Sequence, residues 1–181
     1  MSSVKIAGDT SGVITLTSPA AAGTNTITMP ASTGTMALTS DVPDNVLNTY
    51  ATFVNSTEKV TVSATAATGT INYDTNTQSV VYYTSAAVGD WTINFRASSG
   101  ATLNSVIATG EAITLVHLVT LTGAEYRNTT VQVDGSSITP EWQGGSAPTE
   151  GNINSIDSYA YTIIKTGDAA FTILAALTQF A

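Results

Sequence analysis

The 181-residue chain contains no cysteine. Disulfide bonds, thiolate metal sites and cysteine nucleophiles are therefore excluded. The chain also has a single histidine, His117, so no site within one chain can use two imidazoles. We also expect no metal site and no bound cofactor.

Charged residues are scarce, at 10% of the chain, where about 25% is usual. The 5 Lys and Arg residues are outnumbered by 13 Asp and Glu residues, which gives a net charge of −8 at pH 7. An acidic chain without a basic run is not expected to bind a nucleic-acid backbone. No apolar run reaches the roughly 18 residues of a membrane-spanning helix, and residues 1–6 lack the apolar core of a signal peptide. We therefore expect no nucleic-acid partner and no insertion into a membrane.

Threonine is abundant, with 33 residues, and it is a β-branched type that favours strands. A surface so poor in charge is sparse for a soluble monomer. We therefore expect copies of the same chain, or other proteins, to cover much of it.

The N-terminal segment contains a repeat with a period of eleven residues, whose registers begin at Gly12, Gly23 and Gly34. Each unit predicts a short strand followed by a corner at which glycine tolerates a positive φ. Three such units cannot bury a core alone, so we expect them to pack against equivalent units of other chains or against the rest of this chain. The apolar residues at the fixed fifth slot are the predicted oligomer-interface residues: Leu16, Ile27 and Leu38.

Two changes in the sequence pattern divide the chain into three segments. Residues 1–44 are predicted to form the repeat segment, which docks or trimerises, and residues 45–58 to form a hinge. Residues 59–181 are predicted to form the main domain, because the strand period of two dominates there. We thus expect two folded parts joined by a linker.

The main domain is typical of an all-β fold. Trp91, Ile93 and Phe95 alternate with polar residues, whereas Asn72 and Asp74 are interpreted as turn residues. Seven or eight such strands predict an antiparallel β-sandwich that resembles a jelly roll and follows the short N-terminal β-repeat. The predicted core residues include Phe95, Leu115 and Ile163.

Several stretches resemble structural proteins of tailed bacteriophages. Residues 8–38 are similar to a repeat found in such proteins, especially those of marine phages that infect cyanobacteria. Residues 91–96, 140–148 and 171–180 resemble the final β domain of phage fibre, knob or other virion proteins. The resemblance implies a virion component that is trimeric and docks through its N-terminal part. It implies no catalytic residues.

Four residues in two loops are candidates for glycan binding. Tyr126 and Arg127 lie in one predicted loop, and Trp142 and Gln143 lie in another. Aromatic rings can stack on sugar C–H groups while amide and guanidinium groups bond the hydroxyls. In the alternative interpretation, Trp142 plugs the end of the sandwich and Tyr126 and Arg127 contact a neighbouring subunit.

His117 shares a strand face with Ile113, Leu115, Val119 and Leu121, so we expect its side chain to point into the core or into a subunit interface. One hypothesis is a ring of histidines around a three-fold axis that binds an ion or senses pH. The alternative is a hydrogen-bonded core histidine.

Catalysis has weaker support. Asp134, Glu141, Glu150 and Asp157 lie in neighbouring loops, where two carboxylates could converge for glycoside hydrolysis. Their spacing is not distinctive, and His117 has no nucleophile-elbow motif near it. We expect a protein that is not an enzyme.

These observations favour a trimeric tail fibre or knob subunit in the virion. It would contact itself, other virion proteins and a host-surface glycan. The alternatives are a capsid decoration protein, a free carbohydrate-binding module and a hydrolase.

Overall fold

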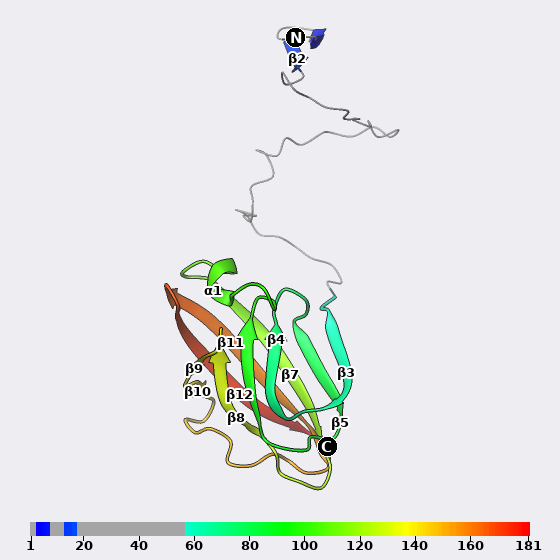
Figure 1. Ribbon diagram of the computed structural model, residues 1–181, viewed down its shortest axis with the longest axis vertical. Coiled ribbons are helices and arrows are strands. Elements are labelled where there is room, and N and C mark those ends of the chain that lie inside the picture. The colour runs from blue at the N-terminus through cyan, green and yellow to red at the C-terminus, as the bar shows by residue number, and fades with distance from the viewer. Residues whose placement is uncertain (1–2, 8–12, 18–56) are drawn as a thin grey trace. The chain divides into compact units, whose positions relative to one another are not determined.

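A computed structural model describes residues 3–7, 13–17 and 57–181 (Figure 1). The chain divides into two units, Met1–Thr52 and Phe53–Ala181, and the division falls within the predicted hinge. In the first unit, β1 (Ser3–Ala7) and β2 (Val13–Thr17) form an antiparallel hairpin. Leu16 lies on β2, in the strand expected for the first repeat, whereas Ile27 and Leu38 lie outside the described residues.

The second unit is a sandwich of two sheets, which confirms the predicted all-β class. The larger sheet has the strand order β10-β12-β11-β7-β5-β3, and the smaller has the order β4-β6-β8-β9. The elements are β3 Val60–Ala66, β4 Gly69–Asp74, β5 Val80–Ser85, β6 Trp91–Arg96, α1 Leu103–Val106, β7 Ala112–Leu121, β8 Asn128–Val133, β9 Ser136–Ile138, β10 Glu141–Trp142, β11 Ser155–Gly167 and β12 Ala170–Phe180.

Strand pairing differs from the antiparallel, jelly-roll-like pairing that we expected. Between β3 and β8 the chain places successive strands in alternate sheets, so each pair of strands forms one coil of a flattened spiral. Strands β3, β5 and β7 are therefore parallel neighbours in the larger sheet, and β4, β6 and β8 are parallel neighbours in the smaller. Short links such as residues 67–68 cross from one sheet to the other, instead of reversing the chain within a sheet.

The last third of the chain is antiparallel where it extends the larger sheet. Strand β11 pairs with β7 over ten positions and forms a long hairpin with β12. Strand β9 turns back on β8 through Asp134 and Gly135, both of which have positive φ. The short β10 pairs in parallel with Leu174 and Ala175 of β12, and among the described residues the rest of β12 pairs with β11 alone.

The core lies between the two sheets and is rich in aromatic rings. Phe95, Leu115 and Ile163 are 0%, 3% and 0% exposed, so all three core predictions are confirmed. The rings of Phe95 and Tyr161 meet edge to face, with their centroids 5.1 Å apart.

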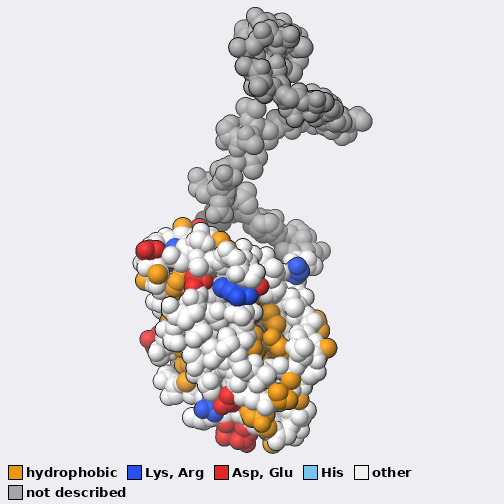
Figure 2. Space-filling view, viewed as in Figure 1, with side chains coloured by type: hydrophobic (Ala, Val, Ile, Leu, Met, Phe, Trp, Pro, Cys, Tyr) orange, Lys and Arg blue, Asp and Glu red, His pale blue; other side chains and the backbone are white. Residues whose placement is uncertain are grey.

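Parallel pairing stacks equivalent residues of successive coils in rows. On the inner side of the smaller sheet, Ile71, Ile93 and Val131 are in register and buried. On its outer side, threonines and amides form similar rows. Figure 2 shows that charged side chains on the visible face gather mostly near the two ends of the sandwich.

The interpretation of Asn72 as a turn residue is wrong, because it lies within β4. Asp74 is the last residue of β4 and begins the turn, since its carbonyl accepts from the N–H of Thr77 at 3.1 Å. Asn94 donates from Nδ2 to Asn72 Oδ1 at 2.9 Å, and Asp74 pairs with Arg96 at 2.6 Å. Their side chains have partners on the next coil, which makes polar residues compatible with a strand.

Candidate functional site

A recess of about 730 Å³ lies between residues 177–179 of β12 and the segment from Trp142 to Asn152. Polar and apolar side chains both line it. The polar group comprises Gln143, Ser146, Thr149, Glu150, Asn152, Thr178 and Gln179, and the apolar group comprises Trp142, Pro148 and Leu177. Amides and hydroxyls beside an aromatic ring are the combination that a sugar requires.

The recess adjoins the end of the sandwich that lies away from Val60. Strands β3, β5 and β7 run in the same direction, and Val60 at the start of β3 is level with Val116 of β7. Leu121, at the end of β7, therefore lies toward the end of the sheet that is away from Val60. The recess-forming segment returns to β11 at Ser155, which is directly opposite Leu121 (Figure 1). Loop side chains at this end are therefore held by the ends of rigid strands.

Trp142 is held in place by both backbone and ring contacts. Its backbone belongs to β10, and the next residue, Gln143, donates from its N–H to the carbonyl of Ala175 at 2.7 Å. The indole meets the rings of Tyr159 and Tyr161 edge to face, at centroid distances of 6.4 and 6.3 Å. Trp142 therefore packs against the core, as in the plug interpretation, and also lines the recess.

The structure does not bring all four predicted glycan residues together. Tyr126 packs against the core and is half-buried, and neither it nor Arg127 lines the recess. The backbone N–H of Arg127 donates to Asp90 Oδ1 at 3.0 Å, and its carbonyl accepts from the N–H of Trp91 at 3.1 Å. The Tyr126–Arg127 loop therefore belongs to the end of the smaller sheet.

The two loops meet at Gly151. Its N–H donates to the carbonyl of Glu125 at 2.9 Å. A Cβ atom at this position would lie 2.2 Å from the carbonyl oxygen of Tyr126 and 2.7 Å from Leu121 Cδ1. Only glycine allows this approach, so Gly151 fixes the end of the recess-forming segment against the Tyr126 loop.

Asp157 organises the turn on the other side of Gly151. It is fully buried, and it accepts from the backbone N–H and Nδ2 of Asn152 at 3.1 and 2.9 Å. Ser155 Oγ donates to the carbonyl of Asn152 at 2.5 Å. The two bonds from Asn152 compensate the burial of the carboxylate, and all three bonds hold Asn152 at the wall of the recess.

The other three carboxylates considered for hydrolysis lie in different places. Asp134 accepts from the backbone N–H groups of Leu103 and Asn104 at 2.7 and 3.0 Å, at the start of α1. Glu141 lies on β10 and lines a separate recess, and Glu150 lines the recess beside Trp142. Of the four carboxylates, two thus have structural hydrogen-bonding roles.

His117 lies entirely within the core of one chain, so its assignment to an oligomer interface is wrong. It is 0% exposed, and its ring meets Tyr83 and Trp91 edge to face at 5.4 and 5.7 Å. Neither ring nitrogen has a hydrogen-bond partner, which differs from the hydrogen-bonded core histidine of the alternative interpretation. Desolvation by burial lowers the pKa of His117 to about 3.

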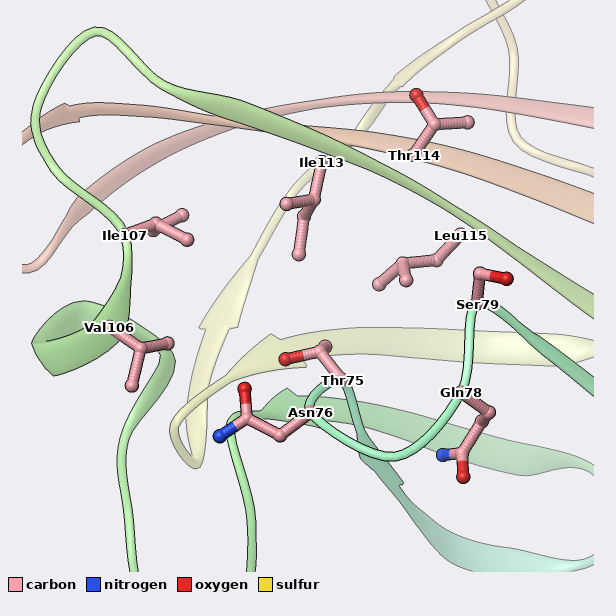
Figure 3. A pocket seen from close by; sticks show the side chains of 9 residues that line it. All are labelled: Thr75, Asn76, Gln78, Ser79, Val106, Ile107, Ile113, Thr114 and Leu115. Carbon is pink, nitrogen blue, oxygen red and sulfur yellow. The ribbon is translucent and has the colours of Figure 1, made fainter. Parts of the chain in front are cut away.

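A second recess, of about 360 Å³, was not expected from the sequence (Figure 3). Val106, Ile107, Ile113 and Leu115 point toward a common space opposite Thr75, and all nine lining residues are uncharged. The aliphatic walls suit an apolar group, and Thr75 and Asn76 present a hydroxyl and an amide on the opposite side of the space. The alternation in β7 predicted the direction of Ile113 and Leu115, whereas the contribution of residues 106–107 depends on the fold.

Searches against protein families, curated proteins and solved structures find no match to this chain. Among the described residues, no group of His, Cys, Asp and Glu side chains is arranged to hold a metal ion. The helix in the described part is too short to span a membrane.

Proposed function

We propose that this chain is a non-enzymatic structural protein of a tailed-phage particle, a trimeric fibre or knob subunit that contacts a host-surface glycan. The recess beside Trp142 carries the glycan part of the proposal. It combines an aromatic ring with amides and hydroxyls and adjoins the end of the sandwich away from Val60. The resemblance of the sequence to phage structural proteins supports the virion part.

In this proposal the first unit docks and the second unit displays the recess. Leu16, Ile27 and Leu38 hold the copies together, and the virion supplies the docking partner. Gln143 and Gln179 give the bound sugar its orientation, because their amides can both donate and accept hydrogen bonds. Trp142 supplies contact area, and Arg127 lies outside the recess lining.

Glycan binding is tested with a glycan array and two matched variants. The double variant Gln143→Ala and Gln179→Ala should lose at least about tenfold in affinity, since two hydrogen-bonding groups are removed. Gln132→Ala is the control, because this glutamine lies on β8 and outside the recess. Equal binding by the double variant and the control would reject the recess as the glycan site.

The virion role is tested separately, by locating the protein on intact particles with electron cryomicroscopy. Density at the tail or baseplate is expected for a fibre or knob. Density distributed over the head would instead identify a capsid decoration protein, and absence from particles would leave a free carbohydrate-binding module.

A further inference from the structure

The two outer faces of the sandwich differ in chemistry. The smaller sheet presents polar residues, including the Asn72–Asn94 pair and the Asp74–Arg96 ion pair. The larger sheet exposes the even-numbered residues of β5, β7, β11 and β12, together with Val60 and Val62 of β3. We call this set of residues the outer face. Odd-numbered residues of the same strands, such as Tyr159, are buried against the smaller sheet.

None of the five long strands of this sheet, β3, β5, β7, β11 and β12, places a charged residue on the outer face. The two charged residues in these strands, Asp157 and Lys165, are both on β11 and both point inward. Lys165 Nζ donates to the carbonyls of Asn104 and Ile107 at 2.6 and 3.0 Å. The charges of the long strands are thus held by internal partners. One carboxylate lies at the edge of the outer face, because the exposed Glu141 of β10 is in register with Leu174 and lines a recess with Ala160.

Large apolar side chains are exposed on the same face. Val62 is 64% exposed, Leu174 is 47% exposed and Phe180 is 58% exposed. Near the middle of the sheet, Tyr82 and Leu118 are in register on neighbouring strands. Apolar residues therefore extend across the sheet from β3 to β12, as in a surface that is covered by a partner.

The outer face is large enough for a stable interface. Its five long strands, β3, β5, β7, β11 and β12, hold 7, 6, 10, 13 and 11 residues. At about 3.3 Å per residue and about 4.8 Å between strands, they cover roughly 750 Å². A stable protein interface buries about 800 Å² on each partner.

We infer that the outer face is an interface between copies of this chain, with a second copy as its occupant. The chain has a net charge of −8, so copies that meet through charged surfaces repel one another. Two outer faces meet through uncharged side chains, except for Glu141 at the β12 edge, and they bury apolar area on both sides. The inference depends neither on the proposed virion role nor on the N-terminal repeat.

The first test measures self-association of the full chain by sedimentation equilibrium. We expect a mass above the 18.6 kDa of one chain. Leu118→Glu places a charge at the centre of the outer face and should raise the dissociation constant at least tenfold. Thr92→Glu is the matched control, because Thr92 lies on the outer side of the smaller sheet. A monomeric wild type, or equal association of the two variants, would overturn the inference.

The second test locates the interface without adding charge. Because the chain has no cysteine, Leu118→Cys and Thr92→Cys each introduce a unique thiol. Maleimide labelling of Leu118→Cys should slow at least fivefold between concentrations below and above the dissociation constant, whereas labelling of Thr92→Cys should not change. If both rates are independent of concentration, the outer face is not the interface, even if the chain associates through another segment.

Discussion

Acid should destabilise the sandwich through His117. The ring is 0% exposed, lies among Trp91, Tyr83 and Tyr159, and has no hydrogen-bond partner for either nitrogen. Burial lowers its pKa from 6.5 to about 3. Between these two values the unfolded chain binds a proton that the folded chain excludes, so the free energy of unfolding falls as the pH falls. Above pH 6.5 the histidine is neutral in both states and its contribution is constant.

The size of the effect follows from the width of this pH window. One pH unit within it corresponds to about 1.4 kcal/mol, so lowering the pH from 6.5 to 4.5 should remove roughly 2–3 kcal/mol. Domains have a total stability of about 5–15 kcal/mol, so the loss is measurable. The neighbouring phenols of Tyr83 and Tyr159 do not oppose it, because burial raises the pKa of both and they stay neutral in acid.

Urea unfolding at several pH values would measure this loss, with tryptophan fluorescence as the probe, since Trp91 contacts the histidine ring. His117→Phe is the control, because it keeps an aromatic ring but cannot bind a proton. Carboxylates elsewhere titrate equally in both proteins, so the difference between the two isolates the histidine. That difference should change by roughly 2–3 kcal/mol between pH 7 and pH 4.5. A constant difference would refute the reasoning.

Other perturbations test the core, the loop contact and the repeat. Truncating Phe95, Leu115 or Ile163 to alanine should each lower the free energy of unfolding by about 2–5 kcal/mol in urea titrations; unchanged midpoints for all three would contradict the assigned strand faces. Gly151→Ala should cost about 1–3 kcal/mol or more by thermal unfolding, because its Cβ would meet the Tyr126 carbonyl. Deleting residues 1–44 should leave the circular dichroism of the sandwich unchanged but prevent docking on particles; normal incorporation would show that the repeat has another role.

The alternation of side chains could be predicted from the sequence, because it depends only on the strand period. It correctly placed Phe95, Leu115 and Ile163 in the core. The pairing of the strands could not be predicted in the same way, because a period of two is common to parallel and antiparallel strands. Links such as residues 67–68 are as short as hairpin turns, although they cross to the opposite sheet.

A similarity between two short stretches of the sequence did indicate that successive coils of the spiral are equivalent. Residues 70–73 read Thr-Ile-Asn-Tyr, and residues 92–95 read Thr-Ile-Asn-Phe. The two stretches are exact register partners on β4 and β6. The similarity would have identified β4 as a strand and Asn72 as a row-forming residue, whereas composition alone pointed to a turn.

The site was predicted only in part, for a different reason. Trp142 and Gln143 are adjacent in sequence and share the recess, but their relation to Tyr126 depends on the close approach at Gly151. Such a contact joins segments that are far apart in the chain, and no local pattern signals it. The direction of His117 was predicted, but a strand period does not reveal whether the opposing side chains come from the same chain or from another.

The scarcity of charge can be related to the geometry of the two proposed surfaces. The outer face lies along the strands, whereas the recess beside Trp142 extends toward the end away from Val60. Copies that pack through their outer faces with parallel strands would present their recesses in the same direction, and their Val60 ends would also lie together. Several weak sugar contacts would then act on one surface at once, which multiplies affinity without new contacts in any single recess. A sheet face whose long strands expose no charge permits this arrangement, because acidic copies can approach side by side with Glu141 only at the edge of the interface.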